Sequence, residues 1–398
     1  MKILFHDYGG YHFTYQLAWA LLEKGHTVNY AYSKTTQQLK RFSDKRAENL
    51  EVTGVTLDRA FDKYNYFQRW FAERDYGKRV ASEIVRFKPD VVLSANTPLD
   101  AQRIIQKASK KVGVGFVFWL QDAIGLATTK ALENKLPLLG KVIGFYYQQL
   151  EKRMLRKSQG VILISEHFLP LMARWGVPKE KTAVIPNWAP LDQIPPQPHD
   201  NSWSEKVGLS QTFNFLYTGV LGLKHDPAIF LSLAEHFAGV EDVRVVVVSK
   251  GERFEWLKSE GERRGLKNLI LLDFQPTEVY PQVLGSADVL VSILSPDAGE
   301  YSVPSKVLSY LCAQRPILLS VPLDNLASRI VLNANAGLVA APGDNKGFLE
   351  KAQELYKNPE MRYDFSRSGR EYAEEAFDIA RIYQKFEAII FSLDKLDR

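Results

Sequence analysis

Cysteine is almost absent from this chain of 398 residues, and Cys312 is the single one. A lone cysteine excludes an intramolecular disulfide and a zinc site built from thiolates, and it is typical of a reducing, cytoplasmic setting. The histidines and acidic residues show no spacing of metal ligands either. The sequence therefore predicts a protein without a resident metal ion.

Long apolar runs and a strong charge of one sign are also missing. No stretch reaches the roughly 18 uncharged apolar residues of a membrane-spanning helix, and no signal peptide is recognised, so any membrane contact is expected to be peripheral. The formal net charge of +5 would suit an anionic substrate or an anionic membrane surface. It is too small to predict binding of nucleic acid.

The sequence does contain a repeated alternation of short apolar runs and helical patterns. An apolar run over residues 2–6 precedes Gly9 and Gly10, and a helical pattern over 13–24 leads to a second apolar run over 27–32. This order predicts a strand, a glycine turn, a helix and a strand, in which the glycines let the backbone approach a ligand at the helix N-terminus. Further strands are expected over 90–94, 115–120 and 161–164, and further helices over 78–87 and 100–111.

The alternation restarts after a segment with five prolines between positions 186 and 198. Strand patterns recur over 213–218, 243–248, 269–272, 289–294 and 317–321. Two such arrays predict an α/β protein of two Rossmann-like, doubly wound domains facing a cleft, because ligands of such sheets bind at the carboxyl ends of the strands. We expect the first domain over residues 1–190, a linker over 191–210 and the second domain over 211–375.

The most informative stretch spans residues 297–323. An apolar strand leads into a loop, and a helical pattern over 307–313 follows Ser305 and Lys306. Free N–H groups at the start of that helix, together with the charge of Lys306, predict a phosphate site. An ordinary strand-to-helix loop with a surface lysine would give the same pattern.

Asp122 follows the apolar run over 115–120, which places a carboxylate at the carboxyl end of a strand. It would accept a proton from a reacting hydroxyl or orient that hydroxyl, although an aspartate that caps a helix or forms a turn occupies the same kind of position. His6, His12 and His225 lie near predicted loops and are expected to be packing or surface residues rather than catalysts.

Residues 135–157 combine basic charge with apolar and tyrosine side chains. Ile143, Tyr147, Leu150 and Met154 recur at helical spacing beside a set of basic residues. The basic residues are Lys135, Lys141, Lys152, Arg153, Arg156 and Lys157. The pattern predicts either an interfacial helix, peripheral on the inner face of the plasma membrane, or a helix packed on the first sheet with a solvated basic face.

Six segments, in order along the chain, resemble one known family. They are Gly9-Gly10 with Gly25-His26, residues 150–165, Ile185–Trp188, Tyr217–Lys224, Ser286–Asp288 with Ala336-Gly337, and Val303–Ile317. Each segment is weak alone, but together they resemble the retaining family 4 glycosyltransferases, most closely the branch that builds bacterial surface polysaccharides. The resemblance implies the GT-B architecture, with a final helix over 376–398 that crosses back to the first domain. It also implies transfer of a sugar from a nucleotide diphosphate sugar, a UDP-sugar by preference, to a hydroxyl of a lipid-linked or polysaccharide acceptor.

The resemblance further implies that the second domain binds the donor without a metal or other cofactor. Lys224 and Lys306 would neutralise the diphosphate, and Asp122 would act on the acceptor side. The implied donor contacts are Gly9, Gly10, Gly219, Lys250, Glu300, Tyr301, Ser302, Val303, Pro304, Ser305 and Ser309. The chain departs from the family pattern at Tyr301 and Ser309, where two glutamates are usual, and it has no arginine shortly before Lys224.

Other functions remain open at this stage. A nucleotide-sugar epimerase of the same fold would need an acid and a base carboxylate in the donor pocket, and Ser309 in place of glutamate disfavours it. A non-catalytic subunit would bind the nucleotide sugar without turnover. A dinucleotide-dependent oxidoreductase is disfavoured more strongly, because no complete G-x-G-x-x-G follows the first strand.

Overall fold

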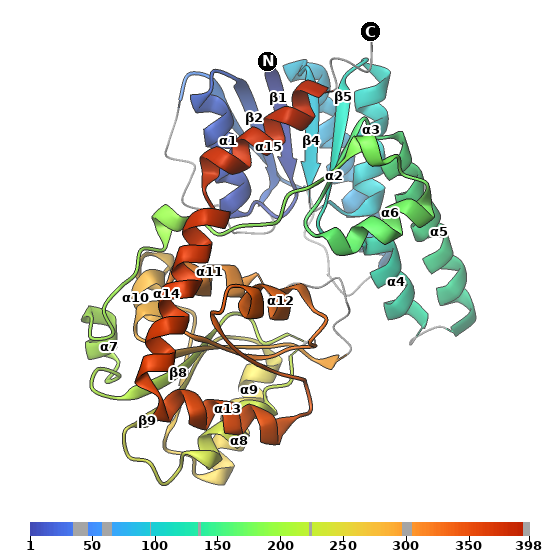
Figure 1. The fold of residues 1–398 in the computed structure, drawn as a ribbon. Helices are drawn as coiled ribbons and strands as arrows, with labels where there is room; N and C mark the ends of the chain where they lie inside the picture. The colour runs from blue at the N-terminus through green and yellow to red at the C-terminus, as the bar shows by residue number, and fades with distance from the viewer. Residues whose placement is uncertain are drawn as a thin grey trace. The chain divides into compact units, whose positions relative to one another are not determined.

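The computed structural model describes residues 1–34, 47–57, 66–95, 97–133, 137–222, 225–296 and 305–392. The chain divides into two units, each built on its own parallel sheet (Figure 1). The first unit comprises Met1–Asn187 and the chain from Ile379 onward, and the second comprises Trp188–Asp378. Residues 191–210, expected as a linker, instead belong to the second unit. The expected cleft between the two domains stays a prediction.

The first unit contains a seven-stranded sheet in the order β3-β2-β1-β4-β5-β6-β7. Its strands are β1 Lys2–Asp7, β2 Thr27–Ser33, β3 Leu50–Val55, β4 Val91–Ala95, β5 Gly115–Leu120, β6 Gly160–Leu163 and β7 Thr182–Val184. The described neighbours all pair in parallel. The sequence predicted five of these strands and missed β3 and β7. Both missed strands lie at an edge of the sheet and have half-exposed residues, so neither carries the continuous apolar run of a buried strand.

Helices cover the first sheet and complete its core. They are α1 His12–Glu23, α2 Tyr66–Phe87, α3 Leu99–Lys111, α4 Ile124–Glu133, α5 Pro137–Lys157, α6 Leu169–Trp175 and α15 Ile379–Ser392. The last helix, α15, lies beside α1 (Figure 1). Its Phe386 is fully buried, with a ring centroid 4.8 Å from that of Trp119 in β5. The end of the chain therefore fills part of the core that its beginning forms.

The second unit contains a six-stranded sheet in the order β10-β9-β8-β11-β12-β13, again with parallel pairing. Its strands are β8 Phe213–Thr218, β9 Val243–Val248, β10 Leu269–Leu272, β11 Val289–Ile293, β12 Ile317–Ser320 and β13 Gly337–Ala340. Its helices are α7 Ser202–Lys206, α8 Ala228–His236, α9 Glu252–Arg264, α10 Tyr280–Gly285, α11 Lys306–Cys312, α12 Leu326–Asn333, α13 Asn345–Lys357 and α14 Pro359–Ala376. Short 3-10 helices are η2 Glu166–Phe168 and η3 Lys179–Lys181 in the first unit, and η4 Leu191–Gln193 and η5 Thr277–Val279 in the second.

The strand order reverses at one place in each sheet. Chain order runs outward from β1 to β3 in one direction and from β4 to β7 in the other, so the switch lies between β1 and β4. In the second sheet the switch lies between β8 and β11. Ligands of doubly wound sheets bind outside the carboxyl ends of the strands at such a switch. The residues that follow these four strands are therefore the candidates for ligand binding.

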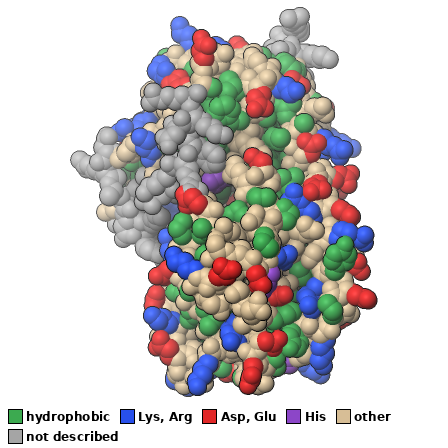
Figure 2. Space-filling view, turned by 90° about the vertical axis from the view of Figure 1, so that its left-hand side faces the viewer, with side chains coloured by type: hydrophobic (Ala, Val, Ile, Leu, Met, Phe, Trp, Pro, Cys, Tyr) green, Lys and Arg blue, Asp and Glu red, His purple; other side chains and the backbone are tan. Residues whose placement is uncertain are grey.

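The surface carries charges of both signs. On the face seen in Figure 2, the acidic and basic side chains that are drawn in colour are interspersed rather than gathered into a field of one sign. This arrangement agrees with the net charge of +5. Within the described ranges, no helix has both the length and the apolar character needed to cross a bilayer.

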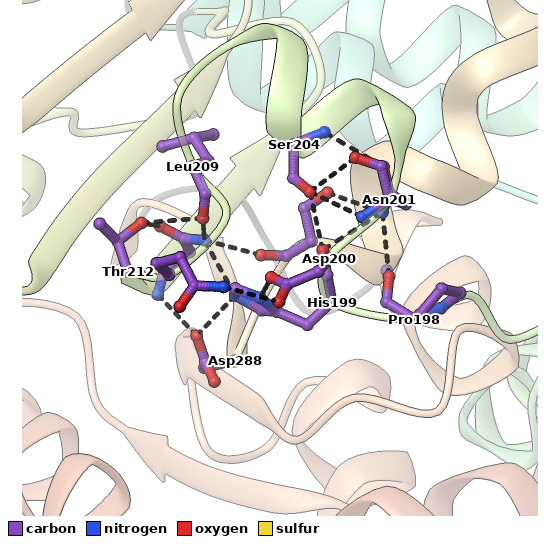
Figure 3. Close-up of polar contacts among 12 residues, drawn as sticks. Pro198, His199, Asp200, Asn201, Ser204, Leu209, Thr212 and Asp288 are labelled. Carbon is purple, nitrogen blue, oxygen red and sulfur yellow. Dashed lines mark hydrogen bonds and ion pairs between the residues drawn. The ribbon is translucent and has the colours of Figure 1, made fainter.

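A histidine between two carboxylates holds residues 198–212 on the second unit (Figure 3). His199 Nε2 lies 3.2 Å from Asp288 Oδ2, and its Nδ1 lies 2.8 Å from Asp200 Oδ1. Asn214 joins the cluster, because its backbone N–H donates to Asp288 Oδ2 at 2.8 Å. The hydrogen bond to Asp288 is the main cause that raises the pKa of His199. Residues expected as a linker are thereby fixed to the start of β8.

We expect the His199 cluster to make the stability of the second unit depend on pH. Because the pKa of His199 is raised in the folded protein, its stabilisation is complete below the unfolded value of 6.5 and is lost as pH rises through the folded value. The His199–Asp288 pair is partly exposed and should contribute about 1 kcal/mol when charged. Melting temperatures of the wild type and His199→Gln should therefore differ most at acidic pH and converge at alkaline pH. A difference that does not vary with pH would contradict this assignment.

Candidate functional site

Lys306, the first residue of α11, extends toward the end of β8. Its Nζ donates to the hydroxyl of Tyr217 at 2.6 Å and lies 3.9 Å from the centroid of the Tyr217 ring. A Cβ on Gly219 would lie 3.1 Å from Lys306 Cε and Nζ, and Gly219 has a φ of 132°, a backbone conformation that favours glycine. The structure thus brings together two residues that the sequence assigned to the donor site. They lie at the switch in strand order of the second sheet.

Burial changes the chemistry of Lys306. It lowers the pKa of the ammonium group to about 7. In the described part of the chain, no carboxylate pairs with Lys306, and Tyr217 supplies a neutral hydroxyl only. Lys306 is half-buried, and a partly buried cation without a counter-ion is unfavourable, so an anionic ligand would relieve that cost.

Tyr217 contacts this lysine and Tyr310 contacts the end of β8. Both lie in family-like segments of the sequence, which assigned them no role. The hydroxyl of Tyr217 donates to Val220 O at 3.2 Å while it accepts from Lys306. The hydroxyl of Tyr310 accepts from the backbone N–H of Thr218 and donates to Val291 O, both at 3.2 Å. Tyr310 therefore ties the end of β8 to β11 directly beneath the Gly219 loop. Such roles depend on contacts between residues far apart in the sequence, which no local sequence pattern predicts.

The structure describes three further predicted donor residues of the second unit, Ser305, Ser309 and Lys250. Ser305 is exposed, and Ser309 is half-buried and hydrogen-bonds with the hydroxyl of Tyr280. Lys250 follows β9, is exposed, and places its Nζ 4.9 Å from the centroid of the Phe274 ring. The remaining predictions, Lys224, Glu300, Tyr301, Ser302, Val303 and Pro304, lie outside the described residues.

Binding of a nucleoside diphosphate should depend on the protonation of Lys306. The free protein holds this group at a pKa of about 7, and a bound diphosphate would raise that value. Above pH ~7 binding must therefore take up a proton, so affinity should fall by up to about tenfold per pH unit until the pKa of the complex is reached. Isothermal titration in two buffers of different ionisation enthalpy measures the proton uptake. A pH-independent affinity above neutrality, with no proton uptake, would contradict the assignment.

In the first unit, the loop after β1 is organised by Asp7. This fully buried carboxylate accepts from the backbone N–H groups of Gly9 at 3.0 Å and Tyr11 at 2.8 Å, and from Thr14 Oγ1 at 2.5 Å. The N–H of Gly10 donates to Asp7 O at 3.1 Å. Burial raises the pKa of Asp7, and these hydrogen bonds oppose the rise. The N–H groups of Gly9 and Gly10 are therefore engaged within the loop, and the role of these glycines as donor contacts stays a prediction.

The need for glycine in this loop has a steric cause. A Cβ on Gly9 would lie 2.1 Å from the ring of Tyr11, and Gly10 has a φ of 61°. Glycine accepts both demands without strain. Gly9 thereby lets the ring of Tyr11 lie over the loop.

A pocket of about 300 Å³ opens beside this loop, within the first unit. Its walls come from the β1–α1 loop, from Thr97 after β4, from the end of β5 and from Glu151 of α5. Asp122 lies on this wall directly after β5, as the sequence predicted for a residue at a strand end. The pocket therefore lies beside the switch in strand order of the first sheet, where ligands of doubly wound sheets bind.

Glu151 holds the turn that carries Asp122. Its carboxylate accepts from the backbone N–H groups of Ile124 at 3.0 Å and Gly125 at 2.9 Å, which begin α4. Burial raises the pKa of Glu151 to about 8, although the two N–H groups lower it in part. The sequence pattern had placed Glu151 in a family-like segment without a role.

The histidine predictions can be compared directly with the structure. His6 is fully buried, with Nδ1 2.8 Å from Ser94 Oγ and Nε2 2.8 Å from the hydroxyl of Tyr76. Burial lowers its pKa to about 3, so it is neutral at physiological pH and acts in packing. His225 Nδ1 lies 3.1 Å from the backbone N–H of Gly222 and belongs to the loop after β8.

Two Rossmann-like units, each built on a parallel doubly wound sheet, are the architecture of the GT-B glycosyltransferases. Two family descriptions match the chain: "Glycosyl transferase 4-like domain" over residues 9–188 and "Glycosyl transferases group 1" over residues 200–372. The chain belongs to the glycosyltransferases that combine these two domains. No curated protein sequence matches it.

Solved structures of low sequence identity share the fold. The complex of Anabaena Alr3699/HepE with UDP-glucose superimposes with a TM-score of 0.72 at 15% identity, and covers 98% of this chain and 100% of that chain. Sucrose-phosphate synthase from Thermosynechococcus elongatus gives 0.75 at 13% identity with full coverage of both chains. WaaG, a glycosyltransferase involved in lipopolysaccharide biosynthesis, gives 0.69 at 16% identity, with 98% and 99% coverage.

Proposed function

We propose that this protein transfers a glycosyl unit from a nucleotide diphosphate sugar to a hydroxyl of a lipid-linked or polysaccharide acceptor, with retention of configuration. The observation that carries the proposal is the ammonium group of the half-buried Lys306, whose one described hydrogen-bond partner is the neutral hydroxyl of Tyr217. It lies beside the Gly219 loop, at the sheet switch where such folds bind ligands. A diphosphate supplies the charge that this group lacks.

The proposed role of each site residue follows from the charge that develops during the reaction. As the sugar leaves, negative charge grows on the diphosphate, and Lys306 and Lys224 would stabilise it in place of a metal ion. Gly219, Lys250, Ser305 and Ser309 would contact the donor. Asp122, on the pocket wall of the first unit, would orient the acceptor hydroxyl. Uridine is the proposed base, a choice supported by the UDP-glucose bound to HepE.

A thermal-shift screen of nucleoside diphosphates tests the donor class. A nucleotide at ~100 times its dissociation constant should stabilise the folded protein by about 2.7 kcal/mol. We expect UDP to give the largest shift. If none of the nucleoside diphosphates stabilises the protein, the proposal fails. Incubation of the preferred nucleotide sugar with and without acceptor glycans then separates transfer from epimerisation, and binding without any turnover would favour a non-catalytic subunit.

We further propose that α5 brings the protein to an anionic membrane on the cytoplasmic side. The stripe that the sequence emphasised is the packing side, because Leu150 and Met154 are buried and Tyr147 donates to Asp100 Oδ2 at 2.8 Å. A second apolar set is exposed, at Leu138, Leu139, Val142, Phe145 and Tyr146. Leu138 is 84% exposed and Val142 67%. Lys135 and Leu136 lie outside the described residues.

Charge on the same helix supports this proposal. Lys141, Arg153, Arg156 and Lys157 are exposed on α5. Apolar and tyrosine side chains suit the headgroup level of a bilayer, and each nearby Lys or Arg adds about 1 kcal/mol of attraction to anionic lipid. A lipid-linked acceptor cannot leave the bilayer, so such docking would deliver the enzyme to its substrate.

A further inference from the structure

We infer that Tyr217 is a positioning residue, whose hydroxyl holds the ammonium group of Lys306 beside the Gly219 loop, where a diphosphate would bind. The inference rests on the proposed donor site. It adds a residue that acts through Lys306 rather than on the substrate itself.

Tyr217 itself is held rigidly. It lies near the end of β8, is fully buried, and packs its ring against Phe230, with ring centroids 5.1 Å apart. Its hydroxyl donates to Val220 O at 3.2 Å. Because a phenol has a single O–H, this hydrogen bond leaves the hydroxyl oxygen to act toward Lys306 as an acceptor. The tyrosine therefore presents a fixed acceptor that suits an ammonium group.

Lys306 depends on this acceptor for its orientation. A lysine side chain has a flexible four-carbon stem, so its ammonium group needs a partner to occupy one place. Among the described residues, the hydroxyl of Tyr217 is the acceptor of Nζ at 2.6 Å, and Nζ lies 3.9 Å from the centroid of the same ring. The face of an aromatic ring attracts a cation. One side chain thus holds the ammonium group by two contacts, beside Gly219.

The ammonium group keeps donors for a ligand. It carries three N–H donors, and Tyr217 takes one of them. Lys306 is half-buried rather than fully enclosed, and the described residues provide no second acceptor for its Nζ. Two donors are therefore available to the oxygens of a diphosphate. A side chain that is already held in place loses less rotamer freedom when the ligand binds.

Tyr217 also favours the charged form of Lys306. Burial lowers the pKa of Lys306 to about 7, and the hydrogen bond and the ring face stabilise the ammonium form against that effect. Burial raises the pKa values of Tyr217 and of Tyr310 on α11, so both hydroxyls stay neutral. A further titratable side chain, His225, packs against Tyr217 with ring centroids 6.4 Å apart. Loss of the Tyr217 hydroxyl should therefore lower the pKa of Lys306 further.

Titration of Lys306 in the nucleotide-free protein tests the inference. The ¹³Cε NMR signals of lysine side chains report protonation, and the signal that is missing from Lys306→Ala identifies Lys306. Tyr217→Phe keeps the ring and removes the hydroxyl, so the titration midpoint should fall by about one pH unit, the scale of one hydrogen bond to a charged group. Tyr217→Leu removes the ring as well and should lower the midpoint at least as far. Titration of His225 affects all these proteins alike. A wild-type midpoint in both Tyr217 variants would overturn the inference.

Binding of UDP, measured by isothermal titration, supplies a second readout. Tyr217→Phe should weaken binding by about tenfold in the wild-type background and should have no further effect in Lys306→Ala, because the tyrosine acts through the lysine. An equal loss in both backgrounds would show that Tyr217 acts independently of Lys306, which contradicts the inference. Melting curves confirm that each variant is folded.

Tyr356→Phe is the matched control in the same unit. The hydroxyl of Tyr356 donates to Asp242 Oδ1 at 3.2 Å, and its ring centroid lies 5.0 Å from that of Phe213, at the start of β8 rather than its end. This variant should keep the wild-type affinity for UDP and the wild-type midpoint of Lys306. A midpoint that falls as far in Tyr356→Phe as in Tyr217→Phe would reject a specific role of Tyr217.

The titration needs no nucleotide, so the inference and the proposed function fail separately. If UDP binds the wild type, but Tyr217→Phe retains both the affinity and the midpoint, Tyr217 has no positioning role and the proposed function stands. If the midpoint falls but no nucleoside diphosphate stabilises the wild type, Tyr217 still positions Lys306 and the proposed donor is rejected.

Discussion

Replacement of Lys306 by alanine is expected to lower turnover by at least ~100-fold in a protein that remains folded, the scale for loss of one group that stabilises transition-state charge. The Lys306 side chain is half-buried, donates to Tyr217 at 2.6 Å and pairs with no carboxylate in the described part of the chain. Its removal therefore leaves no buried partner charge behind, and the fold should tolerate it. Steady-state kinetics with the preferred nucleotide sugar measure the loss, and melting curves confirm folding.

Two variants sharpen this prediction. Lys306→Arg keeps the charge but not the compact ammonium that fits between Tyr217 and Gly219, so it should restore little activity. Lys346→Ala is the control, because that side chain is 88% exposed and its removal should leave turnover unchanged. Near wild-type turnover in folded Lys306→Ala would reject the assignment of the site.

Exchange of four basic residues on α5 for glutamate is expected to abolish binding to anionic vesicles. The residues are Lys141, Arg153, Arg156 and Lys157, all exposed. At about 1 kcal/mol each, their loss alone weakens binding by about 10³-fold, and the new negative charges add repulsion. Vesicle co-sedimentation at low salt measures the effect. Wild-type binding should also weaken at high salt, because ions screen the attraction.

The control for the vesicle experiment changes the same amount of charge elsewhere. Lys206, Lys258, Lys267 and Lys346 are exposed on the second unit, and their exchange for glutamate matches the α5 variant in net charge. If attraction depends on the α5 face, only the α5 variant loses binding, and both variants retain the thermal shift with nucleotide. Equal loss in both variants would show that net charge alone governs vesicle binding. If the wild-type protein does not bind anionic vesicles at low salt, the membrane proposal is rejected.

The strands that the sequence predicted correctly carry a mostly apolar run of residues. Residues 213–218 and 243–248 form β8 and β9 with the predicted bounds, because an uninterrupted apolar run in a parallel sheet has few alternatives. β3 contains Glu51 and Thr53 and is half-exposed, so its pattern resembles a loop. The helix predicted over 78–87 begins at Tyr66, in a segment where charged residues obscure the apolar period.

The candidate site was predictable only where a residue type carries its own chemistry. Lys306 could be named because a lysine at the start of a helix suits phosphate, and Gly219 could be named from the family resemblance. Tyr217 and Glu151 could not, since their roles come from partners 89 and 27 positions away. Asp7 was missed for a different reason, because a buried aspartate at the end of a strand has no distinguishing pattern until the two N–H groups and the Thr14 hydroxyl that donate to its carboxylate are seen.

The return of α15 to the first unit has a consequence for synthesis of the protein. Phe386 is fully buried against Trp119, so the first unit cannot close its core until nearly the whole chain has left the ribosome. The second unit, continuous over Trp188–Asp378, is complete earlier. Domains made first usually fold first. In this protein the order is reversed, and the first half must wait, with an apolar surface exposed, for the last helix to be translated.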